Sequence, residues 1–166
     1  SYGDYPNNAI NCVIMSPTRE LAQQIDQALQ GFSYHLPYIS SVAVYGGNDG
    51  QRYEQELRGM SKGADIIVAT PGRLISHINL GNIDLSKVSF FILDEADRML
   101  DMGFSDDIMQ IAKLLPETRQ TIMFSATTTG TPTSISCRVR YRLRSMLVAS
   151  TMLMTASGLS TSRKSR

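Results

Sequence analysis

The sequence predicts an α/β domain built on a mostly parallel sheet flanked by helices. Three observations carry this prediction: short apolar runs recur along the chain, helical patterns lie between them, and 42% of the 166 residues are hydrophobic. Strands of a parallel sheet are buried on both faces, so they read as continuous apolar runs rather than as alternating ones. Strands that alternate with helical segments are typical of this class, and the length fits one domain.

Five apolar runs are predicted to be strands, and each ends at a turn or at a polar group. The first ends before Ser16-Pro17, the second before Gly46, and the third before Thr70. The fourth ends at Leu93 and is the most apolar of all. The predicted strands span residues 11–15, 41–45, 65–69, 88–93 and 121–124.

Helical patterns fill the segments between these strands. Apolar residues recur every three or four positions from Leu21 to Phe32, which predicts an amphipathic helix after the first strand. Pro71 stands near the first position of another helix, where proline is favoured. A polar helix is predicted over residues 51–60, and shorter helices over 96–100 and 105–115.

The net charge of +1 hides an uneven distribution. Residues 1–127 carry nine Lys and Arg and all fifteen acids, a net charge of −6, whereas residues 128–166 carry seven Lys and Arg and no acid. Such a shift marks a boundary. We expect a partial globular domain over 1–127 and a basic, Ser/Thr-rich tail over 128–166 that is disordered or translated in a shifted frame. A basic RNA-binding arm is the alternative, and the alternating residues 138–144 have the pattern to pair with an exposed sheet edge.

Several classes of protein are excluded by simple counts. Two distant cysteines, Cys12 and Cys137, do not form a disulfide framework or a zinc site. No apolar run approaches the ~20 residues of a membrane helix, and the chain does not begin with a secretory signal. We therefore expect a cytoplasmic protein with no membrane contact.

Polar residues follow the predicted strands, where ligands of such sheets bind. Asp94 and Glu95 come directly after the most apolar strand. One acid at that position can hold a hydrated Mg²⁺, which needs only one or two carboxylates, while its neighbour orients or deprotonates a water. Taken alone, an ordinary capped or solvated turn explains an Asp-Glu pair equally well.

The segment Asp94-Glu-Ala-Asp97 resembles the signature of the DEAD-box ATP-dependent RNA helicases, and four further segments agree with it. All five occur in the family's order over residues 9–127, which is far more specific than any single tetrapeptide. The other segments resemble motif Ia (Pro17-Thr-Arg-Glu-Leu-Ala22), the glycine doublet (Gly46-Gly47), motif Ib (Thr70-Pro-Gly-Arg73) and motif III (Ser125-Ala-Thr127).

The resemblance implies a RecA-like fold, ATP and Mg²⁺ as cofactors, and a role for each matched residue. Asp94 would hold Mg²⁺ through water, and Glu95 would activate the hydrolytic water. Asp97, Ser125 and Thr127 would couple the nucleotide to strand separation. Contacts to the RNA backbone, independent of base sequence, would come from Pro17, Thr18, Arg19, Gly46, Gly47, Thr70, Pro71, Gly72 and Arg73.

One expected motif is missing from the sequence. The phosphate-binding pattern Gly-x-x-x-x-Gly-Lys-[Ser/Thr] occurs nowhere, and none of the four lysines follows a glycine. We therefore expect an incomplete RecA-like domain without its phosphate-loop unit, inactive alone, that works with a second RecA-like domain in a longer protein. The alternative is a non-catalytic RNA-binding or partner-binding module.

Overall fold

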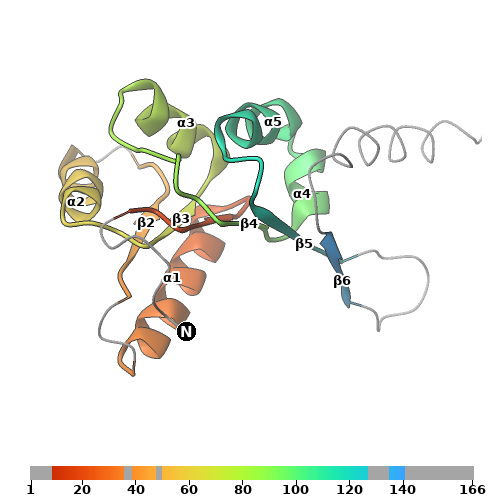
Figure 1. Cartoon of the computed structure of the whole chain (residues 1–166), viewed down its shortest axis with the longest axis horizontal. Helices are drawn as coiled ribbons and strands as arrows, with labels where there is room; N and C mark the ends of the chain where they lie inside the picture. Colours follow the sequence, from red (N-terminus) through yellow and green to blue (C-terminus); the bar gives the residue numbers. More distant parts are fainter. Residues whose placement is uncertain (1–8, 36–38, 48–49, 127–134, 141–166) are drawn as a thin grey trace, which may run out of the picture.

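Five parallel strands form the sheet, and a sixth strand pairs at its edge. A computed structural model of the chain describes residues 9–35, 39–47, 50–126 and 135–140 (Figure 1). The strands lie in the order β2-β3-β1-β4-β5-β6, and β6 runs antiparallel to β5. Their bounds are β1 (Cys12–Met15), β2 (Ser41–Val44), β3 (Ile66–Ala69), β4 (Phe90–Leu93), β5 (Gln120–Ala126) and β6 (Ile135–Arg140).

The predicted α/β class and all five predicted strands are confirmed, with shifts at some strand ends. β4 begins at Phe90 rather than at residue 88, because the Val88 N–H donates to the Leu85 carbonyl in a turn. β5 extends to Ala126, where its pairing with β6 begins. β6 overlaps the alternating stretch 138–144 as far as Arg140. The other expectations for the tail fall on residues 127–134 and 141–166, outside the described residues.

Helices cover the two faces of the sheet unequally (Figure 1). On one face lies α1 (Arg19–Ser33). Because side chains of a strand alternate between faces, Ile14 packs toward α1, whereas Val13 and Met15 pack toward the other side. That other face carries α2 (Gly50–Ser61), α3 (Pro71–Asn79), α4 (Ala96–Asp101) and α5 (Ser105–Leu114).

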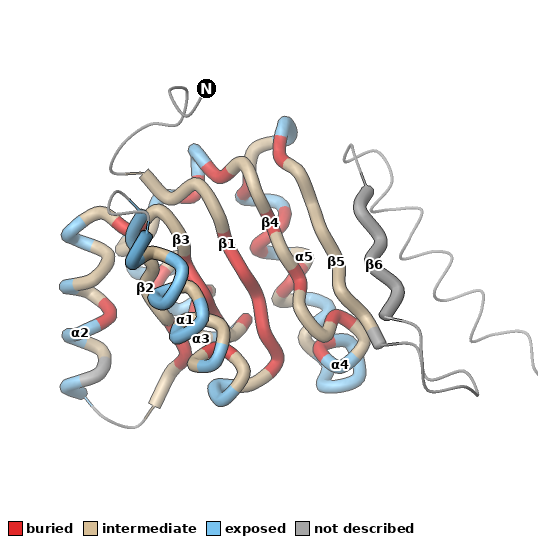
Figure 2. Tube along the Cα trace, turned by 90° about the horizontal axis from the view of Figure 1, so that it is seen from below, coloured by how far each residue is buried: buried red, intermediate tan, exposed pale blue. Residues whose placement is uncertain are grey.

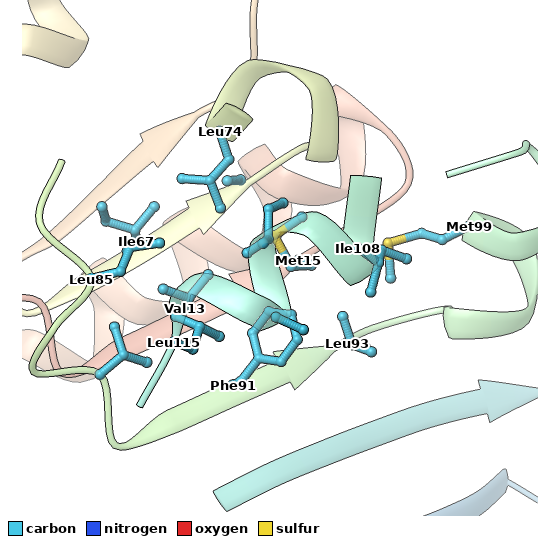
Figure 3. Close-up of a cluster of buried hydrophobic side chains, with 14 of the residues drawn as sticks. Val13, Met15, Ile67, Leu74, Leu85, Phe91, Leu93, Met99, Ile108 and Leu115 are labelled. Atoms are coloured by element: carbon cyan, nitrogen blue, oxygen red, sulfur yellow. The ribbon is translucent and has the colours of Figure 1, made fainter. Parts of the chain in front are cut away.

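The main core lies between the sheet and helices α3, α4 and α5. Met15, Phe91 and Met99 have no exposed surface there, and Figure 3 shows them among side chains from strands and helices. β1 is the central strand, and Figure 2 shows it buried along most of its length. β1 pairs in parallel with both β3 and β4, and the core packs against all three strands. Their carboxyl ends therefore lie at one edge of the sheet.

Candidate functional site

The predicted site residues lie along a single edge of the sheet, which we call the strand-end edge. It comprises the turns that follow β1, β2, β3 and β4 and the last residues of β5. Parallel pairing sets Met15 beside Ala69 on one side and beside Leu93 on the other. The polar turns therefore leave the sheet at the same level, as expected for ligand sites of parallel sheets. Thr127 lies outside the described residues.

Three of these turns meet at what we call the glycine corner, formed by Arg19, Gly46, Gly47 and Arg73. The Arg19 Nη1 donates to the Gly46 carbonyl oxygen at 3.4 Å. A Cβ on Gly46 would lie 3.7 Å from the Arg73 Cδ, so the Arg73 stem packs against this glycine. Gly46 has a φ of +27°, in the region that side chains disfavour. The corner thus joins the first three turns of the strand-end edge.

The turn after β1 uses part of its polar capacity internally. Pro17 is buried, and the Thr18 Oγ1 caps helix α1 by accepting from the Leu21 N–H at 3.3 Å. Arg19, the first residue of α1, is exposed. Of the predicted RNA-binding residues in this turn, Arg19 therefore offers a charged group to solvent, while Pro17 and Thr18 shape the turn.

Helix α3 begins at the strand-end edge with open backbone donors. Thr70 is its N-cap residue and makes no side-chain capping hydrogen bond, and Pro71 occupies the first turn. Gly72 is exposed, and a Cβ placed there would have no atom within 4 Å. The first N–H groups of a helix lack partners within the helix and carry its positive end. This start is therefore suited to an anion such as a phosphate.

Arg73 is tied to a residue that the sequence did not point to. Its Nε donates to the Oε2 of Glu56 at 2.9 Å, and the Glu56 side chain is only 2% exposed. Glu56 lies on the inner side of α2, one turn before Gly59, where a Cβ would come within 2.8 Å of Val42. The sequence does hold a signal that Glu56 faces the protein interior. Tyr53, Glu56 and Met60 recur at intervals of three and four, which places them on one face of α2.

The acidic end of the strand-end edge follows β4. The Asp94 Oδ1 accepts a hydrogen bond from the Glu95 N–H at 3.0 Å. Glu95 has φ 48° and ψ 50°, and in the described residues it is the one non-glycine residue with positive φ. Its Oε2 accepts from the Arg98 Nη1 at 2.9 Å, an exposed pair. Left-handed backbone at a non-glycine residue is often found at functional sites.

The surroundings of Asp94 suit a hydrated divalent cation. Partial burial raises the pKa of the Asp94 carboxyl, the Glu95 N–H opposes that rise, and the Glu95 charge adds to it. A cation at this point would relieve both the desolvation and the repulsion between the two acids. In the described part of the chain, no group of three or more His, Cys, Asp or Glu could hold a metal. Mg²⁺ keeps most of its waters and needs only one or two protein carboxylates, and Asp94 can supply one.

Asp97 and Ser125 occupy neighbouring elements at this acidic end. Asp97 lies in the first turn of α4, and α4 packs against β5. Leu93 pairs with Met123, so Ser125 extends two residues past the level at which β4 ends. The structure therefore brings Asp94, Asp97 and Ser125 to one end of the strand-end edge.

None of the helices described is long and apolar enough to cross a membrane.

Comparison with known sequences finds proteins that are similar to most of this chain. The sequence model of the DEAD/DEAH box helicases matches residues 4–135. The ATP-dependent RNA helicase DeaD of Escherichia coli K12 is 49% identical over 115 residues, which are 69% of this chain and 18% of that protein. The ATP-dependent RNA helicase CshA of Listeria monocytogenes is 45% identical over 124 residues, which are 75% of this chain and 23% of that protein.

Solved structures show the same architecture. The yeast DEAD-box splicing factor Prp28 aligns with a TM-score of 0.69 at 31% identity, covering 78% of this chain and 31% of that chain. A DEAD box protein from Methanococcus jannaschii aligns with a TM-score of 0.64 at 36% identity, covering 74% of this chain and 32% of that chain. This chain thus spans less than a third of each of these proteins.

Proposed function

The chain belongs to the DEAD/DEAH box helicase family, and from that membership we propose that it forms the RNA-contacting part of the first RecA-like domain of an ATP-dependent RNA helicase. One observation carries the proposal: the glycine corner, the start of α3 and the Asp94–Glu95 pair share one edge of one sheet. An enzyme that couples nucleotide hydrolysis to RNA unwinding needs its two sites on a common rigid support.

The RNA contacts would be made to phosphates and sugars. Arg19 and Arg73 offer charge-assisted hydrogen bonds. The α3 start offers the backbone N–H groups of Gly72 and Arg73, because Pro71 has none. Glycines at 47 and 72 allow the RNA backbone to approach closely. Such contacts position a strand without reading its bases, so binding would be independent of RNA sequence.

The nucleotide contacts would be made by the acidic end. Asp94 would hold Mg²⁺ through water, and the ion when bound neutralises charge on the transferred phosphate. Glu95 would orient the attacking water and take its proton. Asp97, Ser125 and Thr127 would link this site to the RNA-contacting side. The remaining groups of the ATP site would come from a phosphate loop and from a second RecA-like domain.

The 166-residue chain alone is expected to hydrolyse ATP no faster than buffer. Phosphoryl transfer depends on positioning of the β- and γ-phosphates, and the sequence contains no Walker A motif to position them. Phosphate release would be measured with and without RNA. Release that RNA stimulates, and that a Glu95→Gln variant lacks, would contradict this part of the proposal.

RNA binding by the chain tests the proposal directly. Fluorescence anisotropy with a labelled single-stranded RNA would compare Arg19→Ala with Arg58→Ala, a control on the last turn of α2. Arg19→Ala should weaken binding and reduce the slope of log affinity against log salt by about 0.7, the loss of one phosphate contact. Arg58→Ala should change neither. Equal effects of the two variants, or a strong preference for one base sequence, would contradict the proposed contacts.

A non-catalytic RNA-binding or partner-binding module is the second candidate, because the glycine corner and the start of α3 could bind RNA without turnover. A chimera separates the two, with residues 9–126 in place of the matched segment of E. coli DeaD. RNA-stimulated ATP hydrolysis by the chimera supports the helicase assignment. A chimera that folds and binds RNA but hydrolyses no ATP supports the module.

A further inference from the structure

A closed network of polar side chains adjoins the glycine corner, and Arg73 is its one member that the proposed function uses. Its members come from α2, from α3 and from the turn after α3. Glu56 and His77 are buried, with 3% and 0% of their surface exposed. The network, which we call the Glu56 network, consists of Tyr53, Glu56, Arg73, His77 and Asn82.

Glu56 is the centre of this network because its carboxylate meets three groups. Its Oε2 accepts from the Arg73 Nε at 2.9 Å and lies 2.9 Å from the His77 Nε2. Its Oε1 accepts from the backbone N–H of Tyr45 at 3.2 Å. Tyr45 directly precedes Gly46, so one buried carboxylate holds both the Arg73 side chain and the backbone that leads into the glycine corner.

The contacts around His77 define its role as a donor to Glu56. The amide nitrogen of Asn82 lies 3.3 Å from the His77 Nδ1 and donates to the Tyr53 hydroxyl at 3.1 Å. A carboxylate can only accept, so the His77 Nε2 is the donor in its contact with Glu56. The Tyr53 ring stacks on His77 with centroids 5.2 Å apart. The chain of contacts returns to Arg73, whose Cζ lies 4.9 Å from the centre of the Tyr53 ring.

This arrangement is poorly explained by stability alone. A buried ion pair roughly breaks even against apolar residues of similar volume, because desolvation of the charges offsets their attraction. What the pair does provide is a fixed geometry, since Arg73 is held at Nε, at its stem by Gly46 and at its guanidinium face by Tyr53. With Nε occupied, the terminal nitrogens of the guanidinium are the groups left to meet a phosphate.

We propose that Glu56 is a positioning residue that fixes Arg73 and the Gly46 turn in their RNA-binding geometry before RNA arrives. This inference rests on the proposed RNA-binding function. A side chain ordered in advance does not lose its rotamer freedom when the ligand binds, and that loss otherwise weakens binding. Arg73 is thus pre-ordered from within the protein, whereas Arg19 reaches the corner from an exposed position.

Replacement of Glu56 by Gln tests the proposal with little change of shape. The Gln carbonyl can still accept from the Tyr45 N–H, but the charged partner of Arg73 is lost. We expect RNA affinity to fall about tenfold, as for other supporting residues. Glu54→Gln is the matched control, because it makes the same charge change on the same helix at an exposed pair. It should leave RNA affinity unchanged.

A double-mutant cycle distinguishes positioning from a general loss of structure. In an Arg73→Ala background, Glu56→Gln should have no further effect on RNA affinity, because Glu56 acts through Arg73. Arg73→Lys keeps the charge but lacks the Nε–H, and it should lose affinity to a similar extent as Glu56→Gln. Additive losses in the double variant, or full affinity of Arg73→Lys, would overturn the proposal. Circular dichroism on every variant would verify folding.

Nuclear magnetic resonance separates failure of this inference from failure of the proposed function. A held Arg73 should show a slowly exchanging Nε–H in the free protein, and Glu56→Gln should abolish it. Should the unsubstituted chain bind no RNA, the proposed function and the RNA role of Glu56 both fail, even with the Nε–H protected. Should the chain bind RNA while the Nε–H exchanges freely, or while Glu56→Gln binds normally, the positioning role alone fails.

Discussion

The two ends of the strand-end edge differ in how their side chains are held. At the glycine corner, Arg73 is fixed by Glu56, which lies 17 positions earlier in the chain and is buried. At the acidic end, the side-chain hydrogen bonds described for Asp94 and Glu95 are local, made to the Glu95 N–H and to Arg98. The glycine corner is thus held by a contact between residues far apart in the sequence, whereas the acidic end is held by contacts within its own turn.

The difference teaches what each end needs from its ligand. At the glycine corner, Arg73 is already paired with Glu56 and held in one geometry, whereas Arg19 offers its charge to solvent. The acidic end holds two neighbouring carboxylates, and the pKa of Asp94 is raised mainly by the partial burial of that carboxyl and to a lesser extent by the Glu95 charge. Glu95 already pairs with Arg98, so an added cation would mainly offset the charge of Asp94. Five substitutions probe this contrast.

The largest effect is expected at the acidic end, on catalysis. In the DeaD chimera, Glu95→Gln should lower RNA-stimulated ATP hydrolysis by on the order of 10²–10⁴, because the group that takes the proton is lost. Nucleotide binding should remain. Steady-state phosphate release and binding of a labelled nucleotide measure the two properties. Unchanged turnover would show that Glu95 does not activate the water.

The largest effect on folding stability is expected at Glu56, which holds the glycine corner. Glu56→Ala leaves His77 and Arg73 without their buried partner, and we expect the free energy of unfolding to fall by about 3 kcal/mol. Glu54→Ala removes an exposed pair on the same helix and should change it by less than about 0.5 kcal/mol. Urea unfolding followed by circular dichroism measures both. Similar small losses in the two variants would show that the Glu56 network does not contribute to the free energy of unfolding.

Gly72→Ala should separate binding from stability at the start of α3. The added methyl group meets no protein atom within 4 Å, so the fold should tolerate it or gain about 0.5–1 kcal/mol. The same methyl group would stand where an RNA backbone approaches, and RNA affinity should fall about tenfold, or about 1.4 kcal/mol. Anisotropy titration and thermal unfolding on one protein sample test both halves. Undiminished affinity would place the RNA away from Gly72.

The strained backbone at Glu95 offers a gain of stability. Since its φ is 48°, replacement by glycine should raise the free energy of unfolding by about 1 kcal/mol. Glu95→Ala retains the strain and serves as the control, as both variants lose the exposed contact to Arg98. Urea unfolding compares them. A Glu95→Gly variant no more stable than Glu95→Ala would indicate that this turn is not strained.

The smallest effect concerns the pH dependence of stability. Folding raises the pKa of Asp94, so its contribution to stability is complete below the unfolded pKa of about 3.9 and is lost as pH rises through the folded pKa. Asp94→Asn lacks this loss. Relative to the unsubstituted chain, the variant should therefore gain stability from pH 4 toward neutrality, by less than about 1 kcal/mol because the group is half exposed.

Asp84 provides a control of opposite sign for that measurement. The Ser86 N–H lowers the pKa of Asp84, so its contribution is present above the unfolded pKa and is lost as pH falls. Asp84→Asn should therefore lose relative stability from acid toward neutral pH. Parallel pH profiles for the two variants would contradict the assignment for Asp94.

The strands of the sheet could be predicted from the sequence because parallel strands that are buried on both faces appear as continuous apolar runs. The runs around Val13, Ile67 and Phe91 are continuous and apolar, and each became a strand. The polar residues after those runs could be placed at one edge from topology alone, and the family resemblance supplied their expected roles. The register with β6 could not be predicted, since alternation of residues 138–144 does not specify a partner.

The supporting residues escaped prediction because their environment is set by tertiary structure. Glu56 and Glu54 are indistinguishable by residue type, yet one is buried in a network and the other exposed. Arg119 is likewise buried, donating to the carbonyls of Leu115 and Pro116 where α5 ends. The left-handed conformation of Glu95 has no local signal in a residue that ordinarily avoids it.

The strand order has a consequence for folding during synthesis. Cys12 of β1 pairs with Ile66 of β3 and Phe90 of β4, which are made 54 and 78 residues later. At roughly 5–20 residues per second, β1 waits about 3–11 s during synthesis for β3, its first partner among the described strands. β2 pairs only with β3 among the described strands, so it waits as well. Until β3 emerges, α1 and α2 are the described elements that can form from local contacts, and the apolar β1 segment remains unpaired with the other described strands.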